Sequence, residues 1–392
     1  MVDMVYIVAA TRTPIGNFNG SLSMLKASDL GGFVIKELLK RSNVDANDVD
    51  EVIMGQALMA GERQNPARQA SSKGGLPFKV PAYNINMLCG SGLKTVVLGY
   101  QSICCGHASI VICGGQENMS GTPHAIYLRE GIKQGTGTMF DTMLHDCLID
   151  PVEETHMGIT AEWLAKDQNI SREEQDQFAL RSQHLAEKAQ QNGYFDKELT
   201  PVTLIDSQGT KTFDKDEFIK LGTKYEKLQK LKPCFIKEGT VTPGNACGIN
   251  DSAAAVLLMS KQEVEKRKLV PLAKIVAWAQ TGLKPIAMGL GPVSAINSVL
   301  VKANWSKEEV DLFEINEAFA AQSLAVVKCL KLDESKVNIN GGAIALGHPI
   351  GASGTRILVT LLYGLERING QKGIASLCIG GGMGIAMAVE RV

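Results

Sequence analysis

Cys89 stands where a thiol could act as a nucleophile. It follows the apolar stretch NINML (84–88) and directly precedes a glycine and a serine. The stretch GSGLKTVVLGYQSI (90–103) predicts a helix, so the sulfur would lie at a helix N-terminus. The partial positive charge there favours the thiolate and would lower the pKa of Cys89. A free cysteine is more often a small buried apolar residue, so both interpretations stay open at this point.

His348 could take the proton of such a thiol. It lies between a glycine and a proline in NINGGAIALGHPIGASG (338–354), so a rigid turn rather than a helix face would hold its ring. A histidine of this kind can stabilise a thiolate by ion pairing. A purely structural role is the alternative.

Two further residues follow predicted strands. Cys378 ends an apolar run and precedes three glycines (380–382), whose N–H groups could stabilise an oxyanion. These glycines lack the Lys-Ser/Thr pair of a P-loop and the spacing of a dinucleotide motif, which disfavours nucleotide binding. Asn316, in EINEAFAAQ (314–322), marks a strand-to-helix junction, where its amide could cap the helix or hold a water or a carbonyl oxygen.

The composition favours a globular protein with a small-molecule partner. A chain of 392 residues predicts two or three domains. A net charge of -1 gives no broad field for nucleic acid or an anionic membrane, and no apolar run reaches membrane-spanning length. Nine cysteines without a basic leader or a zinc-like C-x-x-C pair predict a reducing compartment, the cytoplasm, and no metal site.

The chain contains an internal repeat, which predicts two related halves. Four segments recur in the same order after about 261 to 268 residues: 49–55 with 310–316, 89–92 with 351–354, 109–115 with 375–382, and 6–14 with 274–282. Each half alternates β-branched runs with helical stretches, which predicts an α/β fold of parallel strands covered by helices. The strand-like DSAAAVLLMS (251–260) would close the first half.

An insertion without a counterpart interrupts the first half. It contains a helix signalled by Ser171 as N-cap, Glu174 as the partner in a capping box and Gly193 at the end. The predicted domains are residues 1–119 with 250–270, the inserted loop domain 120–249, and residues 271–392.

These residues together resemble the thiolases, in particular the biosynthetic acetyl-CoA C-acetyltransferases. The resemblance covers essentially the whole chain. Its motifs stand here as NMLCGSGLK (86–94), GGQENMS (114–120), HMGITAE (156–162), GTVTPGNACGINDSAA (239–254), NEAFAAQ (316–322), GGAIALGHPIGASG (341–354) and CIGGGMG (378–384).

The resemblance implies a fold and a reaction. The fold would be two duplicated halves of mixed β-sheet layered with helices, αβαβα, plus the inserted loop domain. Cys89 would be acetylated by acetyl-CoA with His348 as its base, and Cys378 would deprotonate a second acetyl-CoA. His348 and a water held by Asn316 would stabilise the enolate, and the N–H groups of Cys89 and Gly380 the acetyl-enzyme carbonyl. Acetoacetyl-CoA and CoA would be the products, and thiolysis the reverse reaction.

The resemblance also implies a binding site for CoA thioesters, which are substrates, so that no cofactor is expected. The insertion would bind CoA. The subunits would form a homodimer or homotetramer, and residues around 120–145 would carry the tetramer contacts. The implied positions are, for the pantetheine arm, Leu148, His156, Met157, Leu231 and Phe235; for the acyl pocket, Met157, Met288, Ala318 and Phe319; and for the rest of CoA, Lys220, Lys227, Pro243 and Cys247.

Four of these positions depart from the family pattern. Lys220 replaces an arginine near the adenine and loses the flat guanidinium face, and Lys227 replaces a serine. Pro243 and Cys247 replace an alanine and a serine, and a thiol hydrogen-bonds pantetheine poorly. The sequence therefore predicts weaker CoA binding than is typical of the family.

Three alternatives remain. A degradative 3-ketoacyl-CoA thiolase would prefer longer chains, whereas HMG at 156–158 favours short ones. A condensing enzyme that uses acyl carrier protein would lack Cys378 and the insertion. A non-catalytic CoA-binding protein would not need all four of Cys89, Asn316, His348 and Cys378.

Overall fold

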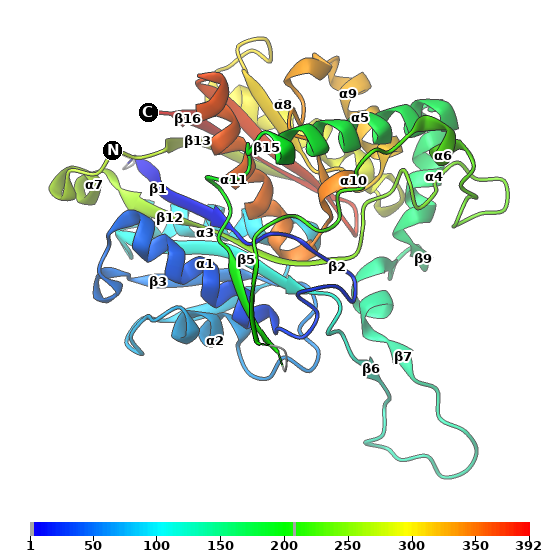
Figure 1. The fold of residues 1–392 in the computed structure, drawn as a ribbon, viewed down its shortest axis with the longest axis horizontal. Coiled ribbons are helices and arrows are strands. Elements are labelled where there is room, and N and C mark those ends of the chain that lie inside the picture. Colours follow the sequence, from blue (N-terminus) through cyan, green and yellow to red (C-terminus); the bar gives the residue numbers. More distant parts are fainter. Residues whose placement is uncertain (1–3, 207–208) are drawn as a thin grey trace.

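The computed structural model describes residues 4–206 and 209–392. One ten-stranded mixed sheet crosses the molecule in the order β14-β15-β16-β13-β1-β12-β5-β3-β4, with β2 beside β12 (Figure 1). Its strands are β1 (Val5–Arg12), β2 (Gly16–Asn17), β3 (Glu51–Gly55), β4 (Ala82–Ile85), β5 (Ile110–Asn118), β12 (Asn250–Ser260), β13 (Ala273–Gly282), β14 (Leu312–Ile315), β15 (Lys372–Ile379) and β16 (Met383–Arg391).

The sheet is a duplication, as the internal repeat predicts. The order β3-β5-β12-β1 in one half corresponds to β14-β15-β16-β13 in the other, with the same strand directions. The halves meet where β1 pairs with β13, through Tyr6 with Lys274 and Ile7 with Ala273. The parallel strands that the strand-helix alternation predicts are found only in part, because β12 and β16 run antiparallel to both of their long neighbours. The mixed sheet that the resemblance implies is confirmed.

The antiparallel pairing follows from the connection between β15 and β16. Only Gly380, Gly381 and Gly382 join these two strands, and parallel strands would need a crossover many residues long. Gly381 and Gly382 have φ of 78° and 82°, a left-handed conformation that glycine adopts without strain. The corresponding connection between β5 and β12 holds residues 119–249. The insertion therefore occupies the place of a three-residue turn.

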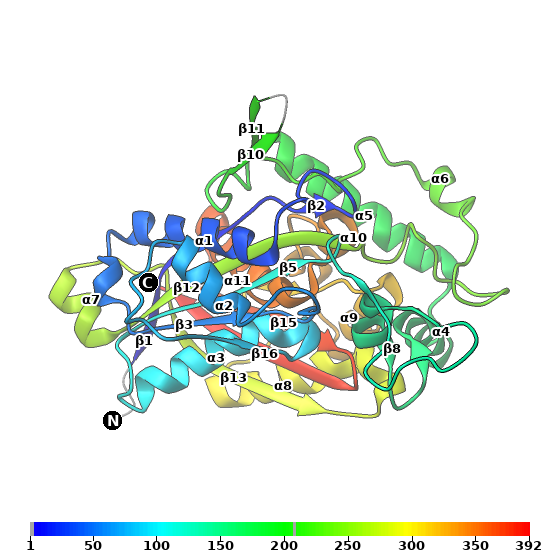
Figure 2. The same ribbon diagram turned by 90° about the horizontal axis from the view of Figure 1, so that it is seen from below.

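Helices form three layers around the two half-sheets (Figure 2). Helices α3 (Ser91–Cys104) and α11 (Ile350–Ile368) pack on each other between the half-sheets. Helices α1 (Ala27–Ser42) and α2 (Pro66–Lys73) cover one outer face, and α8 (Gly291–Ala303) and α9 (Ala320–Leu330) cover the other. The five layers agree with the expected αβαβα arrangement.

The central strands are buried on both faces. In β12, Val256 and Leu258 face the middle layer, whereas Leu257 and Met259 face α1 and α2. Successive side chains of a strand point to opposite faces, so a strand between two helix layers is apolar throughout. This explains why DSAAAVLLMS lacks the apolar-polar alternation of a half-exposed strand.

The inserted segment adds short elements beside the sheet. Its longest helix, α5 (Arg172–Gln191), has Ser171 as N-cap and the capping box with Glu174, as predicted. The remaining elements are β6 (His124–Ala125), β7 (Phe140–Asp141), a short π-helix (Leu144–Leu148), β8 (Ile149–Asp150), β9 (Thr155–His156), α4 (Met157–Asp167), β10 (Val202–Asp206), β11 (Gly209–Phe213) and α6 (Tyr225–Gln229). The domain boundaries themselves stay a prediction.

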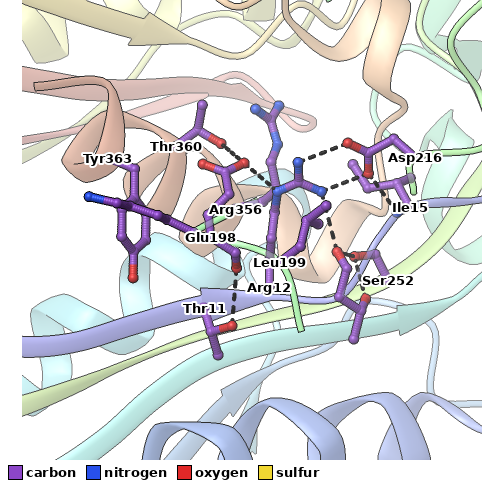
Figure 3. Close-up of polar contacts among 12 residues, drawn as sticks. Thr11, Arg12, Ile15, Glu198, Leu199, Asp216, Ser252, Arg356, Thr360 and Tyr363 are labelled. Atoms are coloured by element: carbon purple, nitrogen blue, oxygen red, sulfur yellow. Dashed lines mark hydrogen bonds and ion pairs between the residues drawn. The ribbon is translucent and has the colours of Figure 1, made fainter. Parts of the chain in front are cut away.

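A buried ionic cluster ties the insertion to the sheet (Figure 3). Arg12, at the end of β1, forms an ion pair with Glu198 at 2.6 Å and a bidentate pair with Asp216 at 2.7 and 2.8 Å. Thr360 of α11 donates a hydrogen bond to Glu198. All four side chains are buried, so this cluster links the insertion to both halves of the molecule.

The segment 285–303 is apolar and long enough, by composition, to span a membrane. In this structure it is a short 3₁₀ helix (Pro285–Leu290) followed by α8. Ile296 and Val299 of α8 pack with Ala386 and Ala388 of β16, so α8 is a helix of the outer core layer.

Candidate active site

Cys89 lies on a short 3₁₀ turn (Leu88–Gly90) immediately before α3. Leu88 has φ of 47°, a conformation that is strained for a branched residue and that tends to occur at functional sites. The Ser91 hydroxyl accepts the N–H of Met87 at 2.8 Å and donates to the carbonyl of Leu88 at 2.7 Å, so it holds the turn. The thiol is thereby fixed at the start of the middle helix layer.

His348 faces Cys89 from the other half of the molecule. Its Nε2 lies 3.3 Å from the Cys89 Sγ. Gly347, with φ of 105°, precedes it, and the N–H of His348 donates to the Asn250 Oδ1 at 3.0 Å. The side chain is 5 % exposed. The two chemically suggestive residues, 259 positions apart, thus form one thiol–imidazole pair.

The expected lowering of the Cys89 pKa is wrong. Burial raises the pKa of Cys89 to about 11, although the backbone N–H of Gly380 opposes part of this effect. Burial and the charge of Arg356 lower the pKa of His348 to about 3. A desolvated site disfavours both charged forms, and this outweighs the helix terminus. At neutral pH the pair is therefore thiol and neutral imidazole.

Cys378 lies on the same cavity, at the end of β15. Its side chain is 1 % exposed, and burial raises its pKa well above that of an ordinary thiol. Gly380, two residues later, begins the β15–β16 turn and directs its N–H to the Cys89 sulfur. The glycine-rich turn predicted to supply an oxyanion donor thus lies beside the nucleophile.

Asn316 follows β14 and contacts His348. Its Nδ2 lies 3.5 Å from both ring nitrogens of His348, so the amide sits over the ring rather than in its plane. The helix-cap interpretation is wrong, because α9 begins after Phe319 and no side chain caps it. The Asn316 Oδ1 is buried without a hydrogen-bond partner, as expected of an atom that receives a water or a substrate group.

One cavity of about 300 Å³ contains most of the predicted site. The Phe235 ring stacks on the His156 ring, with 4.8 Å between the ring centroids, and contacts the Phe319 ring edge-on, with 6.3 Å between centroids. These three rings form an aromatic wall. The predicted residues that line this cavity are Cys89, Leu148, His156, Met157, Phe235, Cys247, Met288, Ala318, Phe319, His348, Cys378 and Gly380.

The remaining predicted CoA-binding residues line a second cavity, of about 250 Å³, whereas Asn316 lines neither cavity. It lies between α5, α6 and residues 243–244, and its lining includes Lys220, Lys227, Leu231 and Pro243. Residues 243–248 border both cavities, since Gly244 lines the second and Cys247 the first. The sequence placed Leu231 with the pantetheine residues, whereas the structure places it beside the lysines.

Three supporting residues were not recognised from the sequence. Glu117, fully buried, accepts the N–H groups of Ala57 at 3.0 Å, Leu58 at 3.1 Å and Gly351 at 2.7 Å, so it joins the two halves at the site. Asn250 forms a hydrogen bond with the backbone N–H of His348, and Ser353 forms one with its ring. Glu117 belongs to the motif GGQENMS, but nothing in the sequence indicated its partners.

Within residues 4–206 and 209–392, no group of three or more His, Cys, Asp or Glu side chains could hold a metal ion. The cavity at the site is lined by the thiols of Cys89, Cys147, Cys247 and Cys378 and by the imidazoles of His156 and His348.

Comparisons with known proteins agree with this geometry. Residues 5–262 match the model for the thiolase N-terminal domain, and residues 269–391 match that for the thiolase C-terminal domain. The chain is 54 % identical to the cytosolic acetyl-CoA acetyltransferase of Mus musculus over 391 residues, which cover 99 % of this chain and 98 % of that protein.

Solved structures agree as well. The Bacillus anthracis acetyl-CoA acetyltransferase superposes with a TM-score of 0.98 at 44 % identity, over 100 % of this chain and 99 % of that one. Human mitochondrial 3-ketoacyl-CoA thiolase in complex with CoA superposes with a TM-score of 0.96 at 43 % identity, over 100 % and 98 %. The domain matches, the relatives and the duplicated fold agree throughout, and the chain belongs to the thiolase family.

Proposed function

We propose that this protein is an acetyl-CoA C-acetyltransferase. It would condense two acetyl-CoA molecules to acetoacetyl-CoA and CoA, and catalyse the reverse thiolysis, through an acetyl-Cys89 intermediate. The observation that carries the proposal is the placement of Cys89, His348 and Cys378 on one apolar cavity. Curated relatives more than 50 % identical over nearly the whole chain carry the name acetyl-CoA acetyltransferase.

The first half-reaction uses the thiol–imidazole pair. The Cys89 sulfur attacks the thioester carbonyl while its proton passes to the His348 Nε2, 3.3 Å away. The N–H of Gly380 beside the sulfur, with the N–H of Cys89, stabilises the oxyanion. The carbonyl then re-forms, the bond to CoA breaks, and the departing thiolate takes the Cys378 proton. Acetyl-Cys89, imidazolium and a Cys378 thiolate remain.

The second half-reaction forms the carbon–carbon bond. Burial makes the Cys378 thiolate a strong base, and it removes a proton from the methyl group of a second acetyl-CoA. The His348 imidazolium and a water bound at Asn316 stabilise the enolate oxygen, and the enolate carbon attacks the acetyl-Cys89 carbonyl. Acetoacetyl-CoA leaves, and His348 returns its proton to Cys89. No cofactor is required beyond the CoA thioesters themselves.

Thiolysis of acetoacetyl-CoA by CoA tests this proposal. The intact protein should cleave the substrate, Cys89→Ala should be inactive, and mass spectrometry after incubation with acetyl-CoA should find a single acetyl group on Cys89. Binding of CoA without any acetyl adduct on Cys89 would instead favour the non-catalytic CoA-binding protein.

A degradative 3-ketoacyl-CoA thiolase is the second candidate, favoured by the likeness to the human mitochondrial enzyme. The buried Met157 and Met288 side chains narrow the cavity and favour a short acyl group. A series of 3-ketoacyl-CoA substrates from four to ten carbons distinguishes the two. A preference for six carbons or more would overturn the acetoacetyl assignment.

The second cavity would hold the adenine and phosphates of CoA, with Lys220 near the adenine and Lys227 close by. Pro243 and Cys247 lie on the segment that borders both cavities, so the pantetheine arm would pass along it. Cys247 offers a half-buried thiol where a hydroxyl would form a stronger hydrogen bond. Weaker CoA binding than in relatives remains part of the proposal.

The proposed assembly is a homodimer or homotetramer in the cytoplasm. The loop between β6 and β7 extends away from the body (Figure 1). It exposes Tyr127, Leu128 and Met139, apolar side chains suited to contacts between subunits. A mouse relative is named cytosolic. Light scattering of the intact protein and of a variant lacking residues 127–138 would give the subunit number and test the role of the loop.

A further inference from the structure

Ser353 contacts the catalytic histidine on the side away from Cys89. It lies in the first turn of α11 and is fully buried. Its Oγ lies 2.6 Å from the His348 Nδ1 and 2.9 Å from the carbonyl oxygen of Pro349. The hydroxyl thus bridges the imidazole and the backbone of the residue that follows it.

The proton inventory of these three groups determines the direction of both bonds. A carbonyl oxygen only accepts, and a hydroxyl has one proton to donate. The Ser353 proton therefore goes to the Pro349 oxygen, and its lone pair receives a proton from the His348 Nδ1. In a neutral imidazole with Nδ1 protonated, Nε2 carries the lone pair. Nε2 is the atom 3.3 Å from the Cys89 sulfur.

We propose that Ser353 is a positioning residue that fixes the tautomer and ring orientation of His348, so that Nε2 can accept the thiol proton of Cys89. Besides Ser353 and Cys89, the side chain of Asn316 also lies within hydrogen-bonding distance of the ring nitrogens. It is 3.5 Å from both of them and so cannot distinguish the two tautomers. The role of Ser353 in catalysis rests on the proposed function. The activation of the Cys89 thiol by His348 can be measured whether or not that function is correct.

The backbone of the same turn supports this role. The His348 N–H is held by Asn250, and the Ser353 N–H also donates to the Pro349 carbonyl, at 2.9 Å. The backbone and the ring of His348 are therefore both anchored. The titratable groups acting on the pair are Arg356 from α11, Glu117 from β5, Cys147 and Cys247 from the insertion, and Cys378 from β15.

The test is the rate of Cys89 alkylation by iodoacetamide between pH 7 and pH 10, followed on the Cys89 peptide by mass spectrometry. Ser353→Ala should react about ten to a hundred times more slowly than the intact protein at pH 7, because the ring loses its orienting acceptor. The difference in alkylation rate between Ser353→Ala and the intact protein should become smaller toward pH 10, because hydroxide there removes the thiol proton without His348. Ser353→Thr, which keeps the hydroxyl, should restore most of the rate.

Thr360→Val is the matched control. It removes a buried hydroxyl of the same helix whose hydrogen bond goes to Glu198 rather than to the active site, and it should react like the intact protein. A Ser353→Ala variant with unchanged reactivity at pH 7, or with the same deficit at every pH, would overturn the proposal.

A direct measurement covers the case in which Ser353→Ala does not fold. ¹⁵N spectra of the imidazole groups, assigned with His348→Gln, should show Nδ1 protonated and Nε2 unprotonated in the intact protein. The reverse tautomer would overturn the proposal. Normal alkylation profiles without thiolysis of acetoacetyl-CoA would contradict the proposed function and leave the positioning role intact.

Discussion

At the scale of single residues, the nucleophile and its base are both uncharged in the resting site. Cys89 holds its proton because burial raises its pKa to about 11, and His348 stays neutral because burial and Arg356 lower its pKa to about 3. Charge separation then occurs only when a thioester offers the sulfur a carbonyl to attack. This arrangement avoids a standing thiolate, the form of cysteine that is most easily oxidised or alkylated.

The two cysteines should be separable by half-reaction. In Cys378→Ser, Cys89 and His348 are unchanged and CoA can leave as its thiolate without the Cys378 proton, so acetyl-CoA should still leave an acetyl group on Cys89. Carbon–carbon bond formation loses its base, and turnover should fall by about a hundredfold or more. Intact-mass spectrometry and the thiolysis assay measure the two steps. Cys329→Ser, which alters an exposed cysteine, should change neither, and an unacetylated Cys378→Ser protein would contradict the division of roles.

His348 should also leave a signature in stability. Its folded pKa is about 3, below the ordinary value of 6.5, so between these pH values the unfolded chain binds the extra proton. The free energy of unfolding should therefore rise with pH across this window, by up to about 1.4 kcal/mol per pH unit from this residue.

Denaturant unfolding between pH 4 and pH 7 measures that slope. Glu117 and Glu314, whose pKa values burial raises to about 7 and about 8, act in the opposite direction but are common to both proteins compared. The slope should be smaller in His348→Gln than in the intact protein. Equal slopes would mean that His348 takes up its proton in the folded state.

The chemistry of single residues was only partly predictable. The residue types at 89, 316, 348 and 378 suggested thiol chemistry, and the family resemblance gave them roles. The direction of the Cys89 pKa was wrong, because burial depth depends on side chains hundreds of positions away. The role of Ser353 was not predicted. A serine in GAS at the start of a helix does not indicate which side chain it contacts until the position of His348 is known.

At the scale of elements, the two cavities divide the predicted CoA site. The inner cavity is lined by the β15–β16 turn, the 3₁₀ turn before α3 and the aromatic wall, whereas the outer one lies between α5 and α6. The elements of the insertion therefore contribute to both. The acyl group and the nucleotide would then contact different parts of the chain and can be examined separately.

Lysines of the outer cavity should contribute to substrate binding and not to chemistry. Lys220→Ala and Lys227→Ala should raise KM for acetoacetyl-CoA severalfold with kcat nearly unchanged, because a cation beside the nucleotide of CoA is lost. The same variants should handle acetoacetyl-pantetheine, which lacks the nucleotide, like the intact protein. Higher KM values for both substrates would place the lysines elsewhere on the path.

At the scale of the whole molecule, the insertion is held by charges as well as by apolar packing. Arg12→Met would leave Glu198 and Asp216 as buried carboxylates without their cation. Removing one partner of a buried ionic cluster typically destabilises a protein by about 3–5 kcal/mol. Thermal or denaturant unfolding should show this loss. Lys197→Met, which breaks the exposed pair with Glu366, should leave the unfolding midpoint unchanged, and equal effects would contradict the importance of burial.

The overall fold was more predictable than the site. The repeated segments identify the equivalent strands of the two halves, β1 with β13, β3 with β14 and β5 with β15, because both halves preserve the same apolar pattern. Strand direction was not predictable in the same way. It depends on the length of each connection, and the glycines 380–382 suggested an oxyanion donor without showing that they form a hairpin turn.

The reacting atoms of Cys89 and His348 come from opposite halves of the duplicated sheet, 259 residues apart, and meet only where α3 packs on α11. A nascent chain that has folded its first half holds a cysteine but no base. Acyl transfer by this pair can therefore begin only after the half that carries His348, residues 271–392, has been synthesised and docked. Completion of folding is itself the switch that turns the nucleophile on.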